Sequence, residues 1–106
     1  MIISTPDKIP DKEITEILGI VKGSTVRAKH LGQDIFSVLK SIVGGELDAY
    51  TSLLNEAREQ AIDRIIIDAQ RMGADAIVNV RLTASSVMDT ASEILAYGTA
   101  IKLTIQ

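Results

Sequence analysis

The chain lacks cysteine and tryptophan altogether, and it has a single histidine among its 106 residues. Without cysteine it has no disulfide framework, no thiolate metal site and no cysteine nucleophile. A single histidine excludes metal sites built from several imidazoles and most triads that depend on a histidine base. Aromatic residues make up only 3%, so the core has to be built from isoleucine, leucine, valine and alanine.

A strong charge of either sign is also missing, because 11 basic and 14 acidic residues leave a formal net charge of −3. This weakly acidic balance argues against a general nucleic-acid-binding protein. No apolar run has the length needed to span a bilayer. The apolar start of the chain is followed at once by Pro6, Asp7 and Lys8, unlike a signal peptide. We therefore expect a cytoplasmic protein that binds neither nucleic acid nor membrane.

What the chain does have is apolar content, since 46% of its residues are hydrophobic. That content and length predict one folded domain spanning residues 1–106. A domain this small leaves roughly a third or more of its unfolded-chain surface exposed after folding. Association between copies of the chain would cover apolar parts of that surface. The alternative is the scattered apolar surface that any monomer has.

The first quarter of the chain gives a mixed pattern. Ile2-Ile3 is typical of a short strand, and the segments around Pro6 and Pro10 are typical of loops. In residues 13–29, the apolar residues from Ile14 to Val21 have helical spacing, whereas the β-branched pairs at 20–21 and 25–26 favour a strand. Periodicity alone leaves both interpretations of this stretch open.

Two helices are predicted in the middle of the chain. The apolar spacing favours a short helix from about Gly32 to Val43, with Gly44-Gly45 as a corner after it. A long helix follows from about Glu46 to Met72, and Gly73 is the expected C′ residue because glycine adopts the left-handed conformation cheaply. Its apolar stripe consists of Leu47, Tyr50, Leu54, Ala57, Ala61, Ile65, Ala69 and Met72.

Two strands are predicted at the C-terminal end. Apolar residues alternate with polar ones from Ala76 to Ala84, residues 85–93 are expected to form a polar loop, and a second strand runs from Ile94 to Ile105. One face of that second strand carries Ala96, Gly98 and Ala100, small enough for a helix to approach closely. We therefore predict an α+β fold of two layers, β-α-β-β, in which a long and a short helix pack on an antiparallel sheet. Assembly into a closed oligomer would then remove exposed strand edges such as residues 94–105.

Several segments together resemble the YbjQ-like family, and the resemblance covers nearly the whole chain. The segments are Leu18-Gly-Ile-Val-Lys-Gly, Ile42-Val-Gly-Gly, Tyr50, Arg58, Ala61, Gly73-Ala-Asp-Ala-Ile-Val-Asn-Val-Arg81 and Tyr97-Gly-Thr-Ala-Ile. The resemblance implies a fold like that of dodecin subunits, a pentameric ring, and a strand over most of residues 13–29. Members of the family have no established function, although the family carries a heavy-metal-binding label.

Two features expected of such proteins do not carry over to this sequence. Soft metal ions prefer thiolate and imidazole ligands, and the chain has no cysteine and one histidine. Dodecins stack flavin on tryptophan, and the chain has no tryptophan. We therefore expect no cofactor.

Four residues are weak candidates for ligand binding: Arg27, His30, Asp34 and Arg58. His30 and Asp34 are four residues apart and offer one nitrogen and one oxygen to a cation, but a structural metal site needs about four ligands. A solvated histidine is the better interpretation, and we assign no metal site. Arg27 belongs to a small basic patch, for which a solvated strand face is the alternative. The guanidinium of Arg58 is able to bind a carboxylate, but a structural role is favoured for this residue.

Three classes of function follow, in this order. The first is a non-enzymatic, homo-oligomeric ring of five subunits that acts as a scaffold or binds a small ligand. The alternative is a heavy-metal-binding protein, which the family label supports and the ligand inventory opposes. The third is an enzyme with a site between subunits, for which the sequence shows no catalytic residues in a recognisable arrangement.

Overall fold

The computed structural model describes residues 1–28, 48–88 and 91–105, with side chains for 1–26, 54–86 and 92–104. The predicted short helix over 32–43 and the Gly44-Gly45 corner lie outside these residues. The elements are β1 (Ile2–Ile3), β2 (Lys12–Ala28), α2 (Asp48–Arg71), β3 (Ala76–Met88) and β4 (Ala91–Ile105).

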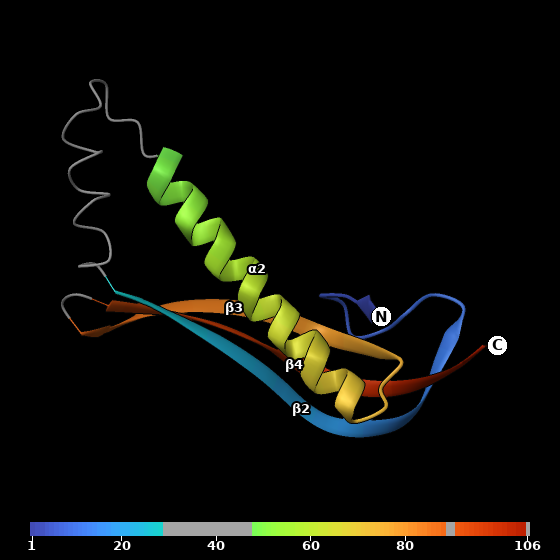
Figure 1. Cartoon of the computed structure of the whole chain (residues 1–106). Helices are drawn as coiled ribbons and strands as arrows, with labels where there is room; N and C mark the ends of the chain where they lie inside the picture. The colour runs from blue at the N-terminus through green and yellow to red at the C-terminus, as the bar shows by residue number, and fades with distance from the viewer. Residues whose placement is uncertain (29–47, 89–90, 106) are drawn as a thin grey trace.

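The strands form one four-stranded sheet in the order β1-β3-β4-β2, and α2 crosses one face of it at an angle (Figure 1). The α+β class and the packing of the long helix on a sheet are confirmed. The sheet is mixed, however, because β1 pairs with β3 in parallel, while β3, β4 and β2 are antiparallel. The expectation that residues 94–105 form an exposed edge is wrong, since β4 lies between β3 and β2. Among the described strands, β2 forms one edge of the sheet and the two-residue β1 lies at the other.

The ambiguous residues 13–29 fold as part of one strand of 17 residues, β2. Register shifts between Ile14 and Glu16 and between Ile17 and Gly19 mark two β-bulges. Each bulge inserts an extra residue and resets the alternation of side chains. As a result Ile14, Ile17 and Ile20 face the same side of the sheet, although their spacing in the sequence is that of a helix.

The core forms where the stripe of α2 meets the sheet. Ala57, Ala61, Ile65 and Ala69 are fully buried, which confirms the central part of the predicted stripe. They pack in one cluster with residues of all three long strands, namely Val21, Ile77, Val80, Ile94, Ala96 and Ala100. Ala96 and Ala100 of β4 therefore pack beneath the helix, as predicted, whereas a Cβ added to Gly98 would meet Ile77 and Val80 of β3.

The helix approaches the sheet closely at Gly23 of β2, a position that the sequence analysis did not single out. A Cβ added to Gly23 would lie 2.6 Å from the Cβ of Arg64 and 2.8 Å from the carbonyl oxygen of Ala61. No side chain fits between β2 and the helix backbone at this point. The side-chain hydroxyl of Thr25 donates a hydrogen bond to the carbonyl of Ala57 at 3.0 Å, in a buried position.

The C-terminal end of α2 is a Schellman motif, which confirms Gly73 as the C′ residue. Gly73 has φ +78°. Its N–H donates to the carbonyl of Gln70 at 3.0 Å, and the N–H of Ala74 donates to the carbonyl of Ala69 at 3.0 Å. These two bonds satisfy carbonyls that the last turn of the helix would otherwise leave without partners.

β3 departs from the predicted pattern in two places. Asn79 adopts φ 55° at a bulge, so Ile77 and Val80 both join the core beneath α2, and the uninterrupted alternation predicted through Ala84 is wrong. The loop predicted over residues 85–93 is also wrong, because β3 continues to Met88 and β4 begins at Ala91. In this region Ser85 and Ser86 pair with residues 93 and 92.

We expect Gly23→Ala to lower the free energy of unfolding by about 1–3 kcal/mol, because the added methyl group overlaps the helix backbone. Urea denaturation followed by circular dichroism measures this change. Ser24→Ala is the matched control, since Ser24 is half-buried on the opposite face, and we expect it to change stability by less than about 0.5 kcal/mol. Equal stability of the two variants would show that the helix does not approach β2 at Gly23.

Candidate functional site

Of the four predicted ligand-binding residues, Arg58 alone has a described side chain. His30 and Asp34 lie outside the described residues, and Arg27 is described only as part of the backbone of β2. Arg58 is exposed on α2, where its guanidinium donates a hydrogen bond to Oδ1 of Asn55 at 2.9 Å. Arg58 and Asn55 both belong to α2, so this hydrogen bond lies within the helix and away from the pocket formed by residues 8–14.

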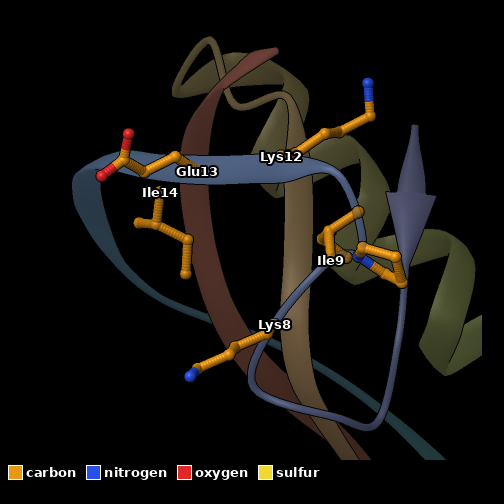
Figure 2. Close-up of a pocket in the computed structure, with 6 residues that line it drawn as sticks. Lys8, Ile9, Lys12, Glu13 and Ile14 are labelled. Atoms are coloured by element: carbon orange, nitrogen blue, oxygen red, sulfur yellow. The ribbon is translucent and has the colours of Figure 1, made fainter. Parts of the chain in front are cut away.

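A pocket of about 560 Å³ lies where the N-terminal segment turns into β2 (Figure 2). The turn is closed by a hydrogen bond from the N–H of Lys12 to the carbonyl of Ile9 at 3.3 Å. Pro10 and Asp11 occupy its two central positions, and the φ of 61° at Asp11 is typical of a type II turn. The residues that line the pocket are Lys8, Ile9, Pro10, Lys12, Glu13 and Ile14.

The charged groups of this pocket diverge rather than converge. Figure 2 shows the side chains of Lys8 and Lys12 pointing away from each other, with the carboxylate of Glu13 on another side of the strand. The apolar part comes from Ile9, Pro10 and Ile14, and Ile9 also packs against a second core cluster, which consists of Ala76, Val78 and Ile101. The pocket therefore offers an apolar wall with separate charges at its rim, an arrangement that fits no acid–base pair or nucleophile.

Among the described residues, the most exposed large apolar side chains lie on the sheet face that α2 does not cover. Ile14, Ile17, Ile20 and Val26 of β2 pair with residues 103, 101, 99 and 93 of β4, so all four share this open face. Ile17 and Ile20 expose 71% and 74% of their surface, and Val26 exposes 55%. We refer to these four residues as the apolar strip. Tyr97 of β4 is 39% exposed on the same face.

The apolar strip belongs to an edge strand, and α2 lies directly beside that edge. The guanidinium of Arg64 donates a hydrogen bond to the carbonyl of Ser24 in β2. Ile67 follows Arg64 by three residues, which puts it on the same side of the helix, and it is 47% exposed. The flank of the molecule at β2 thus carries exposed aliphatic side chains on both faces of the sheet.

The donor set of the chain does not fit a soft heavy-metal ion. Within residues 1–28, 48–88 and 91–105, no three histidine, cysteine, aspartate or glutamate side chains come together in a way that could hold a metal ion. The whole chain has no cysteine, and its single histidine, His30, is outside those residues. Soft metal ions prefer thiolate and imidazole ligands, which this sequence can supply only once.

Together the fold and its exposed edge define a small α+β protein in which one helix crosses a four-stranded mixed sheet. The chain belongs to the YbjQ family, because the family model described as "Putative heavy-metal-binding" matches residues 1–104. In the described part of the chain, no helix is long and apolar enough to cross a membrane.

Relatives in archaea and bacteria match this chain over nearly its whole length. A UPF0145 protein of Methanosarcina acetivorans is 61% identical over 103 residues, covering 97% of both chains. One from Psychromonas ingrahamii is 57% identical, covering 97% of this chain and 98% of the relative. A solved structure from Pediococcus pentosaceus, a DUF74-family protein of unknown function, has a TM-score of 0.67 at 15% identity and 98% coverage of both chains. These names assign no activity, and the structural likeness supports the fold.

We expect the purified, untagged protein to hold less than one Cd²⁺ or Zn²⁺ per subunit after dialysis against a low concentration of either ion, because it lacks the donors for a closed site. Elemental analysis by mass spectrometry measures the bound metal. His30→Ala is the matched control. One tightly held ion per subunit that disappears in His30→Ala would contradict this expectation.

Proposed function

We propose that the protein functions as a homo-oligomer, a closed ring that acts as a scaffold or holds a small ligand, and not as an enzyme. The observation that supports this proposal is the apolar strip on edge strand β2. The ring of five subunits and the cytoplasmic location come from the sequence analysis, where the family resemblance implies the number five.

The strip is costly to leave in water. Fully burying an isoleucine side chain stabilises a protein by about 1.5–3 kcal/mol, and Ile17 and Ile20 keep most of that surface exposed. An edge strand also presents unpaired backbone groups, which natural proteins protect with charges, bulges or a covering element. β2 has two bulges and several charged residues, of which Lys22 shares the open face between Ile20 and Val26, yet four aliphatic side chains are exposed on that face. A second copy of the chain would bury them.

The same arrangement favours a ligand site that assembly completes. Ile14 belongs both to the apolar strip and to the lining of the pocket. A neighbouring copy that covers the strip would therefore lie beside the open pocket and add a wall to it. Because the charged groups of Lys8, Lys12 and Glu13 diverge at the rim, the apolar wall would favour a ligand with an apolar body.

We expect Ile20→Lys to shift the protein from oligomer to monomer, because the substitution places a charge in the centre of the strip. Native mass spectrometry of untagged protein measures the assembly and any bound mass together. Gln70→Lys is the matched control, since it adds the same charge on an exposed residue of α2.

The wild-type protein and Gln70→Lys should give the same oligomer, and a mass beyond the protein chains would favour ligand binding over a scaffold. A monomeric wild-type protein would refute the proposed function. An oligomer that tolerates Ile20→Lys would show that the strip is not its interface.

A further inference from the structure

We infer that the open face of the sheet binds the phosphate group of a small organic phosphate, through Lys22 of β2, Tyr97 of β4 and Arg81 of β3. We call these three residues the cross-strand row. The row is built by a single chain, so this inference goes beyond the proposed function and does not depend on self-association. It uses neither the pocket at residues 8–14 nor the apolar strip.

The strand order places the three residues of the row side by side. β4 lies between β3 and β2 (Figure 1), and Tyr97 is the register partner of Lys22 on one side and of Arg81 on the other. Directly opposed residues on neighbouring strands have Cβ atoms about 4.5–5.5 Å apart on the same face. The strands that carry Lys22 and Arg81 are therefore separated by about 10 Å, with the tyrosine between them. All three residues are exposed.

The row has hydrogen-bond donors that the fold does not use. Nη1 of Arg81 donates to the carbonyls of Thr5 at 3.0 Å and Val80 at 2.9 Å, which fixes the position of the guanidinium. The Nε and Nη2 groups of the same guanidinium form no hydrogen bond with another described residue. The same holds, within the described residues, for the ammonium of Lys22 and the hydroxyl of Tyr97. These donors are available to a ligand.

The positive charge of the row is not neutralised by a nearby carboxylate. In the described part of the chain, no carboxylate forms an ion pair with Lys22 or Arg81. Glu93 shares this face of the sheet but precedes Tyr97 in β4 by four residues, a distance of about 13 Å along the strand. This separation exceeds the Debye length of about 8 Å at physiological ionic strength. The row is thus locally cationic, although the chain has a formal net charge of −3.

A phosphate monoester matches the charges and donors of the row. Near neutral pH it carries a charge of about −1.5 to −2 and three acceptor oxygens, opposite the two cations and the phenol of the row. Guanidinium binds phosphate through paired hydrogen bonds, and ammonium adds a compact positive charge. Tyr97 is 39% exposed, so its ring offers an apolar surface to the organic part of the ligand. Ser24 and Thr83 occupy the next row of the same face and add hydroxyl groups beside the phosphate.

Titration of the full-length protein with phenyl phosphate, followed by ¹H–¹⁵N NMR, tests the inference. We expect saturable shifts of the backbone signals of the row. Lys22→Gln should bind about tenfold more weakly, because one charge-assisted hydrogen bond is lost. Arg81→Gln should weaken binding in the same direction. Arg71→Gln is the matched control, since it removes the same charge from an exposed residue at the end of α2, and it should bind like the wild-type protein.

Lys22→Gln is the decisive variant, because Lys22 forms no bond with another described residue and its replacement leaves the fold intact. Equal affinity of Lys22→Gln and Arg71→Gln would overturn the inference, since net charge and not the row would then attract the ligand. Shifts confined to other residues would also overturn it. Binding to vesicles that contain phosphatidic acid, without binding to phenyl phosphate, would overturn it in favour of a lipid surface.

Native mass spectrometry of the same samples separates this inference from the proposed function. A monomeric protein that binds phenyl phosphate at the row supports the inference and refutes the proposed function. An oligomer that does not bind phenyl phosphate overturns the inference and leaves self-association standing.

Discussion

The close packing of α2 against the edge strand β2 is the constraint on which the rest of this structure depends. Gly23 lets the backbone of the helix approach the strand, Thr25 bonds the carbonyl of Ala57, and Arg64 bonds the carbonyl of Ser24. Because the helix is fixed over one side of the sheet, it shields the helix-side face of β2 and leaves the far end of β3 uncovered. The exposed surfaces of the molecule follow from where this one helix is attached.

The structure could be predicted from the sequence where interactions between residues close together in the chain determine it. The stripe of α2, its end at Gly73 and the small face of β4 each depend on residues close together in the chain. The bulges at Gly19 and Asn79 depend on pairing with a distant strand, which periodicity does not report. Ser85 and Ser86 suggested a loop by composition, but pairing with β4 extends the strand through them.

The candidate site was harder to predict than the fold for a related reason. Arg27, His30 and Asp34 were selected by residue type, and the structure describes the side chain of none of them. The apolar strip carries no unusual residue type. Its isoleucines are exposed because β2 lies at an edge and two bulges turn them to the open face, and both facts require the strand order. Strand order depends on residues far apart in the chain, so no short sequence pattern marks the apolar strip.

The family label and the surface of the chain point to different chemistry. A site for a soft metal ion needs several thiolate or imidazole donors, and this sequence has one histidine and no cysteine. Among the described residues, its most exposed large side chains are aliphatic and lie on an edge strand, a surface better suited to contact with apolar groups than to coordination of a cation. Within residues 1–28, 48–88 and 91–105, no three carboxylate or imidazole side chains come together, so the described surface offers an apolar contact and no soft-metal site.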